Sequence, residues 1–202
     1  TQKTISNKIS FKGVGIHSGI QAELNILPAA PNTGIVFKRT DLKKNNLVYA
    51  SYANVTDTTL CTTISNEYGI KVSTIEHLMA AFYGTGIDNA IIEINSEETP
   101  ILDGSAKLFV KAIQKMKLNS SDQPIKIIKI NKNIEIRDGE KFISIDESNI
   151  TGEIEFEIKY SNSVINTQKN KVNIFEDDLE DIYNSRTFCL YEDIEKLKKL
   201  NL

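Results

Sequence analysis

Short segments with strand-like alternation recur along most of this chain, and they limit it to folds built around sheets. In residues 20–27, IQAELNIL, the apolar residues occupy every second position, as in a half-buried strand. The face that they form comprises Ile20, Ala22, Leu24 and Ile26. Similar segments in the first half are GIVFKR, LVYASYA, LCTTIS, IKVS and AIIEI. Because turn residues separate them, as in PAAPNTG, we expect a mostly antiparallel sheet.

Two helices are predicted among these strands. The first spans residues 74–83 and is closed by Gly84 and Gly86, since glycine is favoured just after a helix. The second spans residues 105–116, with Asp103 as its N-cap. Strands combined with helices in this way predict the α/β class, in its α+β form.

A polar stretch, LNSSDQP at 118–124, interrupts the pattern before strand-like segments resume and a helix follows at 191–200. We therefore predict a first domain at 1–118, a linker at 119–124 and a second domain at 125–202. The second half repeats the order of strands followed by a helix, which suggests a structural duplication.

Composition narrows the possible partners. The chain has 202 residues, 40% of them hydrophobic, and a formal net charge of −3. This charge leaves no basic excess for a phosphate backbone, so no nucleic-acid partner is predicted. No segment reaches the roughly 18–20 apolar residues of a membrane span, and the N-terminal residues lack the apolar core of a signal peptide. We therefore predict a cytoplasmic protein that binds a small molecule or another protein, and we make no prediction of its oligomeric state.

The segment STIEHLMAAF allows two interpretations of Glu76. Ser73-Thr74-Ile75-Glu76 fits the S-x-x-E capping box, in which Glu76 serves the helix N-terminus. In a second interpretation, compatible with the first, Glu76 and His77 are a base and a metal ligand, because the helix dipole favours an ionised carboxylate and a neutral imidazole there. Small residues follow on the face of His77, which would let another element or a ligand approach. They are Ala80, Ala81 and Gly84.

The chain has only one further histidine, His17, in the glycine-rich segment FKGVGIHSGI. A tight turn with a locally bonded His17 is one interpretation; a metal site of His77, His17 and acidic residues is another. A nucleotide-binding fingerprint is not favoured, since neither a P-loop lysine nor a crossover helix follows. Residues 185–188, SRTF, are predicted to form a loop before the last helix.

Taken together, several segments resemble the zinc-dependent UDP-3-O-acyl-N-acetylglucosamine deacetylases of lipid A synthesis in Gram-negative bacteria. They occur in family order at compatible spacing: GVGIHSG (13–19), PAAPNTGIVFKRTDL (28–42), TTLCTTIS (58–65), STIEHLMAAFYGTGIDNAIIEIN (73–95), PILDGSA (100–106) and SRTFCLYEDIEKL (185–197).

The resemblance implies two small two-layer sheet-and-helix sandwiches of similar topology, the second one incomplete, with Zn²⁺ between them. It implies hydrolysis of the 2-acetamido group of UDP-3-O-acyl-N-acetylglucosamine, which releases acetate. Glu76 would be the general base, His77 a zinc ligand, and Thr187 a hydroxyl donor that stabilises the tetrahedral oxyanion.

The resemblance also implies a substrate pocket. Leu60, Cys61 and Phe188 match residues that line it, and Ile194 matches a wall of the apolar passage for the 3-O-acyl chain. The chain departs from the family pattern in one respect: two further zinc ligands and a histidine acting as general acid have no counterpart among these residues. The match covers roughly the first two thirds of a typical member.

Two hypotheses follow. In the first, the chain is the N-terminal part of a deacetylase, active only with the remaining residues. In the second, it is a non-catalytic relative that binds a UDP-sugar or a protein partner. The reading frame after Leu202 distinguishes them.

Overall fold

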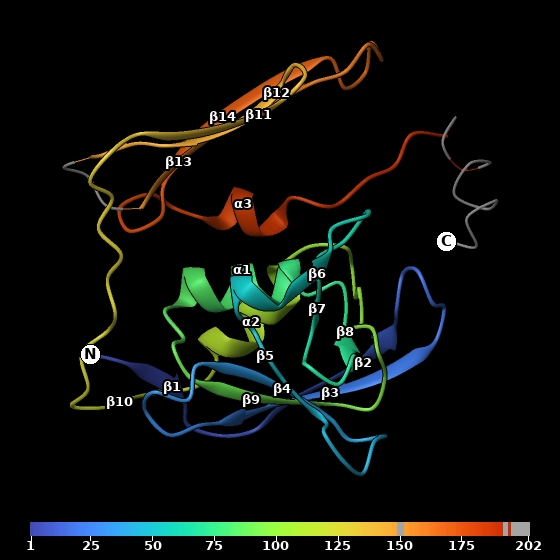
Figure 1. Ribbon diagram of the computed structural model, residues 1–202, viewed down its shortest axis with the longest axis vertical. Coiled ribbons are helices and arrows are strands. Elements are labelled where there is room, and N and C mark those ends of the chain that lie inside the picture. Colours follow the sequence, from blue (N-terminus) through green and yellow to red (C-terminus); the bar gives the residue numbers. More distant parts are fainter. Residues whose placement is uncertain (149–151, 192–193, 195–202) are drawn as a thin grey trace. The chain divides into compact units, whose positions relative to one another are not determined.

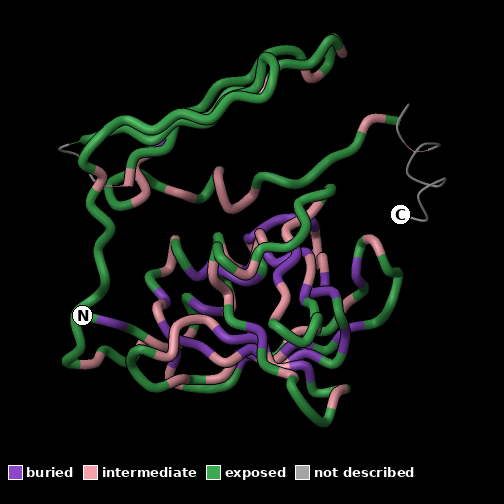
Figure 2. Tube along the Cα trace, in the orientation of Figure 1, coloured by how far each residue is buried: buried purple, intermediate pink, exposed green. Residues whose placement is uncertain are grey.

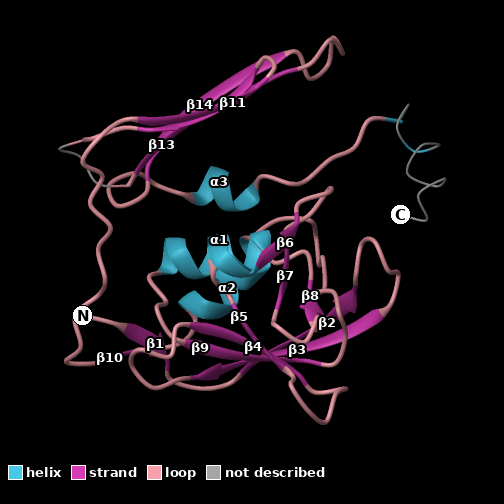
Figure 3. Cartoon of the chain, viewed as in Figure 1, coloured by secondary structure: helices cyan, strands magenta, loops and turns pink. Residues whose placement is uncertain are grey.

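The computed structural model describes residues 1–148, 152–191 and 194. Its residues form two compact units, one of residues 1–125 with 180–202 and one of residues 126–179. Figure 1 labels the helices and strands of both units, and Figure 3 colours them by type. The prediction of an α+β fold is confirmed, because strands and helices both contribute to the first unit. The predicted domain boundaries at 118 and 125 stay predictions.

The centre of the first unit is a five-stranded sheet in the order β2-β3-β9-β4-β5. Its neighbours are antiparallel except for β4 and β9, which run parallel. The strands are β2 (Ile9–Val14), β3 (Gln21–Pro28), β4 (Ile35–Arg39), β5 (Leu47–Tyr49) and β9 (Ala90–Ile94). The mostly antiparallel sheet predicted from alternation is therefore confirmed, with one parallel pair that alternation could not reveal.

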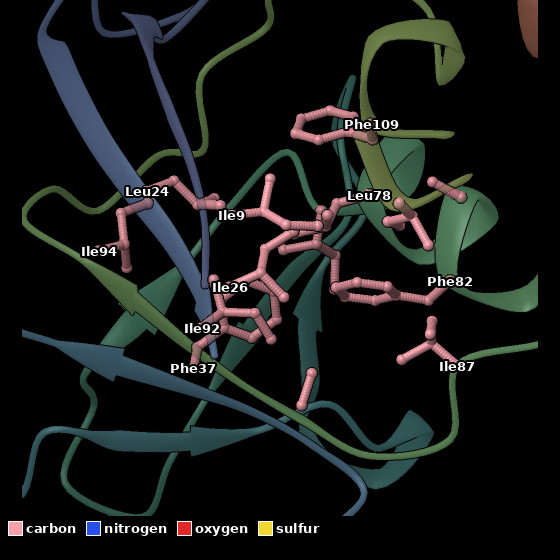
Figure 4. Close-up of a cluster of buried hydrophobic side chains, with 14 of the residues drawn as sticks. Ile9, Leu24, Ile26, Phe37, Leu78, Phe82, Ile87, Ile92, Ile94 and Phe109 are labelled. Carbon is pink, nitrogen blue, oxygen red and sulfur yellow. The ribbon is translucent and has the colours of Figure 1, made fainter. Parts of the chain in front are cut away.

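One face of this sheet forms the core. Leu24 and Ile26 on β3 and Ile92 on β9 are fully buried, and helices cover them (Figure 4). The opposite face carries cross-strand charge pairs instead, such as Lys12 with Glu23. This separation of apolar from charged residues is the one that period-two alternation predicts. Ile20 is an exception: it lies before β3 and is exposed.

The helices α1 (Glu76–Thr85) and α2 (Lys107–Gln114) pack against each other over the buried face. Helix α1 ends at Gly86, whose φ of 72° is left-handed, as predicted for a terminating glycine. The prediction that Gly84 also closes the helix is wrong, because Gly84 lies within it. The predicted caps are wrong, because Ile75 and Ala106 occupy the N-cap positions without a side-chain hydrogen bond.

The side chains expected to cap the helices are used elsewhere. Ser73 donates from its hydroxyl to the carbonyl of Glu97, and Glu76 accepts from a backbone amide outside its own helix. Asp103 accepts instead from the amide and hydroxyl of Ser105 in the preceding turn. In each case a tertiary or turn contact replaced the local cap that the sequence pattern predicted.

Smaller sheets complete the first unit. Strand β1 (Lys3–Ile5) pairs with β10 (Leu118–Ser120), and β6 (Val55–Asp57), β7 (Thr63–Ser65) and β8 (Lys71–Val72) form a three-stranded sheet. A short 3-10 helix, Tyr52–Asn54, precedes β6, and helix α3 (Glu180–Asn184) packs on α2. The first unit thus includes a helix, α3, that the sequence did not predict.

The second unit consists of two antiparallel hairpins. They are formed by β11 (Ile134–Asp138) with β12 (Lys141–Ile145), and by β13 (Glu153–Lys159) with β14 (Thr167–Asn173). Most of their residues are exposed (Figure 2), including Ile136 and Ile143. Strand β14, TQKNKVN, was missed because it is too polar to show alternation.

Two further sequence predictions concern the last helix and membrane-spanning segments. The helix predicted at 191–200 lies mostly outside the described residues, where only residues 191 and 194 have an assigned structure. Among the described residues, no helix is long and apolar enough to cross a membrane.

Candidate functional site

Glu76 begins helix α1, and its two carboxylate oxygens have different surroundings. Oε1 accepts a short hydrogen bond from the backbone amide of Thr62, in the loop before β7. Oε2 is buried, and among the described residues it has no hydrogen-bond partner. Burying a carboxylate oxygen without a partner is unfavourable, so such an atom is an indication of a functional site. The geometry holds one oxygen of the carboxylate and leaves the other without a hydrogen bond among the described residues.

His77 follows on the same helical turn and is half-buried. The predicted approach of another element to the small residues of this helix is confirmed at Gly84, where a Cβ would lie 2.9 Å from Cε1 of Tyr183 in α3. Ala80, by contrast, is exposed, and Ala81 is in the core. The face of His77 is therefore covered at its far end by α3.

The loop of residues 58–62 approaches the start of α1. Its Thr62 binds Glu76, and the two preceding residues are the predicted pocket residues Leu60 and Cys61. Leu60 has a φ of 62° and is 59% exposed, an unusual combination for a bulky residue. Cys61 is half-buried, with Sγ 3.8 Å from Oγ1 of Thr63. Leu60 and Cys61 thus directly precede the residue whose amide binds Glu76, and their role in a pocket stays a prediction.

Glu98 holds the segment before α1 in place. Its Oε1 accepts from the backbone amide of His17 at 3.0 Å and from Oγ1 of Thr74 at 2.9 Å. Its Oε2 accepts from the amide of Ser18 at 2.8 Å, and Nδ1 of His17 lies 3.0 Å from Oε1. The side chain of Glu98 is 3% exposed, so it links the glycine-rich loop to the entry of α1 from within the protein.

The pKa of Glu98 reflects these bonds. Burial raises it, but hydrogen bonds from Ser18, His17 and Thr74 outweigh burial and lower the pKa from 4.5 to about 2. Glu98 is therefore ionised at neutral pH and can only accept hydrogen bonds. His17 must then carry its proton on Nδ1, which fixes the orientation of the ring.

His17 was expected either in a tight turn or in a metal site with His77. The turn is present, since the amide of Gly19 donates to the carbonyl of Gly15 at 3.0 Å. The bonding of the imidazole is not local, however, because its partner Glu98 is 81 residues away in sequence. Among the residues that the structure describes, no three His, Cys, Asp or Glu side chains gather in a way that could hold a metal.

A different set of contacts positions Thr187. Its backbone amide donates to the carbonyl of Gly104 at 3.0 Å. The preceding residue, Arg186, donates from Nε to the carbonyl of Asp103 at 2.9 Å and from Nη2 to Oδ2 of Asp103 at 3.3 Å. The segment after α3 is therefore attached to the turn before α2.

The remaining predicted substrate residues are near the end of the chain. Phe188 is 51% exposed and directly follows Thr187. Ile194 has helical backbone and is half-buried. Their roles as pocket and passage residues stay predictions.

The residues present fit one part of a zinc site. A histidine that directly follows a glutamate with a buried, unpartnered carboxylate oxygen supplies the residue types that a metal ligand and a base require. The described residues supply no complete ligand set, so further ligands would have to come from elsewhere.

The sequence did not identify Glu98, Thr62 or Arg186 as contributors to this site. Glu98 stands in EETP, a segment without a helical or strand period, and Thr62 acts through its backbone amide, which no residue pattern reveals. Arg186 was noted only as part of a loop. Its pairing with Asp103, 83 residues away in sequence, depends on the fold.

Comparison with known proteins identifies the class of enzyme to which the chain is similar. Proteins named UDP-3-O-acyl-N-acetylglucosamine deacetylase, which are hydrolases, match the whole chain. The one from Vibrio cholerae serotype O1 (strain ATCC 39541) is 38% identical over 205 residues, 100% of this chain and 67% of its own length. That from Shewanella violacea is 40% identical over 204 residues, 100% of this chain and 66% of its own. That from Aliivibrio fischeri is 38% identical and 67% covered.

The family model described as LpxC, UDP-3-O-acyl N-acetylglycosamine deacetylase, matches residues 2–202. The chain belongs to this family, as the resemblance in its motifs predicted. It spans about two thirds of the length of the curated relatives.

Proposed function

We propose that this chain carries the general base and one zinc ligand of a deacetylase that acts on UDP-3-O-acyl-N-acetylglucosamine. The reaction would hydrolyse the 2-acetamido group to the free amine and acetate. The names of the relatives support the substrate, and the unpartnered Oε2 of Glu76 beside His77 is the observation that carries the proposal.

Glu76 is suited to accept a proton from water. The amide of Thr62 holds Oε1, so the carboxylate cannot rotate freely, and Oε2 faces no competing donor among the described residues. A base must lie within hydrogen-bond reach of the proton that it removes, and a fixed carboxylate keeps it there.

In the proposed reaction the water oxygen bonds to the acetamido carbon while a water proton passes to Oε2 of Glu76. The hydroxyl of Thr187 donates to the oxyanion that develops on the former carbonyl oxygen. The C–N bond then breaks as the general acid, which the family pattern places outside these residues, donates a proton to the nitrogen. Acetate leaves, and the proton on Glu76 is returned through solvent to the general acid. Bound zinc, held in part by His77, would supply Lewis-acid polarisation.

The family pattern places two more zinc ligands and the general acid outside these residues. This chain has two histidines in all, and the proposal uses only His77 as a ligand. We therefore propose that the 202 residues alone have little or no activity. The cytoplasmic location and the pocket roles of Leu60, Cys61 and Phe188 are part of the same proposal.

The test is acetate release by protein expressed from the complete reading frame with zinc. Glu76→Gln keeps the size of the side chain and removes the base, so we expect turnover to fall by roughly 10²–10⁴-fold. The zinc content should stay at the wild-type value. The exposed Glu23→Gln is the matched control and should retain wild-type turnover.

Three results would contradict this proposal. Full turnover in Glu76→Gln would exclude Glu76 as the base, and loss of zinc in that variant would make it a ligand instead. Binding of the substrate by the wild-type protein without any acetate release would favour the non-catalytic relative.

A further inference from the structure

The turn between β9 and α2 has a shape that leaves Asp103 available to another segment. Leu102 and Gly104, on either side of it, have φ values of 55° and 78°, both left-handed. Within the turn, Ser105 donates to Oδ1 of Asp103 from its amide at 3.3 Å and from its hydroxyl at 2.8 Å. Oδ1 is thereby used by the turn itself, while Oδ2 and the carbonyl of Asp103 accept from outside it.

Those outside donors come from two consecutive residues. Arg186 donates to the carbonyl and to Oδ2 of Asp103, at 2.9 Å and 3.3 Å. Thr187 donates its amide to the carbonyl of Gly104 at 3.0 Å. A Cβ on Gly104 would lie 3.7 Å from Cγ2 of Thr187, so the two residues are in close contact. Both the backbone and the side chain of Thr187 therefore lie against this turn.

The exposure of the ion pair indicates what it contributes. The side chain of Arg186 is 63% exposed and that of Asp103 is 24% exposed. Ion pairs of this kind add little to stability, because solvent screens them and the side chains lose conformational freedom. The planar guanidinium of Arg186, however, donates to a carbonyl and a carboxylate at once and so fixes the orientation of the segment that carries it. A lysine ammonium has no such fixed pair of donors.

We propose that Asp103 and Arg186 are positioning residues that act through Thr187. Together they set the direction of the Thr187 hydroxyl relative to the reacting carbonyl oxygen. This inference rests on the proposed function, in which that hydroxyl stabilises the oxyanion. Donors of this kind contribute only when they point at the developing charge, and a small displacement greatly reduces the effect.

The test is a double-mutant cycle on kcat, with protein expressed from the complete reading frame. Thr187→Val should lower kcat by roughly 10²–10³-fold, the range for loss of one oxyanion donor. Arg186→Lys and Asp103→Asn should each lower kcat by roughly 10–100-fold with little change in KM. In the Thr187→Val background, Arg186→Lys should have no further effect on kcat. Arg137→Lys, in a hairpin of the second unit, is the matched control and should keep wild-type kcat.

A second readout is independent of activity. Arg186→Lys should speed amide hydrogen exchange at Thr187, whose N–H is bonded to Gly104, without changing exchange in the strands of the central sheet. A purely structural role would instead raise exchange throughout the unit.

The outcomes separate the inference from the proposed function. If Arg186→Lys lowers kcat by the same factor in the presence and absence of the Thr187 hydroxyl, the positioning role is overturned while the deacetylase proposal stands. If Thr187→Val keeps wild-type kcat, Thr187 has no oxyanion role and the inference is overturned with it. The Glu76→Gln result then decides independently whether the rest of the proposed function holds.

Discussion

Thr74 donates a hydrogen bond from Oγ1 to Oε1 of Glu98 at 2.9 Å, and this bond joins the entry of α1 to a buried carboxylate. Thr74 has a φ of 57°, an uncommon conformation for a β-branched residue, which the surrounding bonds must maintain. Glu76 and His77 follow Thr74 after one residue, at the start of α1. The position of the candidate base therefore depends on a buried carboxylate that takes no part in the proposed chemistry.

The first prediction concerns the pH dependence of stability. Because the pKa of Glu98 falls from 4.5 to about 2 on folding, its ionised form favours the folded state. That contribution is complete above about pH 4.5 and is lost as the pH falls towards 2. At about 1.4 kcal/mol per pKa unit, this fall from 4.5 to about 2 means that Glu98→Gln should lower the unfolding free energy at pH 7 by up to about 3.5 kcal/mol.

Urea unfolding followed by circular dichroism at a series of pH values measures this effect. The difference between Glu98→Gln and wild type should shrink as the pH approaches 2. The control is Glu23→Gln, at an exposed pair with Lys12, which should change stability little at any pH. A constant difference across the whole pH range would show that Glu98 acts by packing alone.

The second prediction concerns the glycines of the GVGIHSG loop. A Cβ at Gly15 would lie 2.6 Å from Cδ of Glu98, whereas one at Gly19 would meet nothing within 4 Å. Gly15→Ala should therefore displace the carboxylate and cost about 1–3 kcal/mol, as overpacking does. Gly19→Ala should cost about 1 kcal/mol, because its φ of 64° disfavours alanine.

The two variants also differ in pH dependence. Gly15→Ala should weaken the acid-sensitive part of the stability that Glu98 provides, while Gly19→Ala should leave that part intact. The same urea series distinguishes them. If both variants lost equal stability and kept the wild-type pH profile, the contact between Gly15 and Glu98 would be unimportant.

The sequence predicted those parts of the fold that depend on local periodicity. Strands β3 and β9 follow their alternation, and the α1 helix ends at Gly86 as expected. The capping box at Ser73 was wrong because the carboxylate of Glu76 bonds the amide of Thr62, a contact between distant segments. Local patterns identify a side chain that could cap, but they cannot show that a tertiary donor is closer.

The candidate site was predictable to a similar extent. Glu76 and His77 could be singled out from their residue types and helix position, and the family resemblance gave them roles. The bonds that hold them could not be inferred, since Glu98 is 24 residues from Thr74 and 81 from His17 in sequence. Such contacts follow from the packing of β9 and the loops around it, which no single segment encodes.

The third prediction concerns zinc affinity in protein from the complete reading frame. His77→Ala removes a proposed ligand, so zinc affinity should fall by at least the roughly 10–100-fold seen when a supporting residue is lost. His17→Ala should keep the wild-type zinc stoichiometry, because Nδ1 of His17 is bonded to Glu98. Competition with a chelator measures both affinities. Equal zinc loss in the two variants would favour a site shared by both histidines.

The fourth prediction concerns the contact between α1 and α3. Replacing a glycine inside a helix with alanine usually stabilises it by about 0.5–1 kcal/mol. At Gly84 the new Cβ would lie 2.9 Å from Cε1 of Tyr183, so Gly84→Ala should give no gain or a net loss. In the Tyr183→Ala background the obstacle is gone, and the same substitution should stabilise by about 1 kcal/mol.

Unfolding free energies of the two single variants and the double variant measure this coupling. A non-additive term of about 1 kcal/mol or more, with the double variant more stable than the sum predicts, is expected for groups in direct contact. Limited proteolysis near residues 180–184 should also be faster in Gly84→Ala, because the new Cβ would disrupt the contact of Tyr183 in α3 with α1. Additive free energies together with unchanged proteolysis would mean that the packing of Tyr183 on α1 does not require a glycine at position 84.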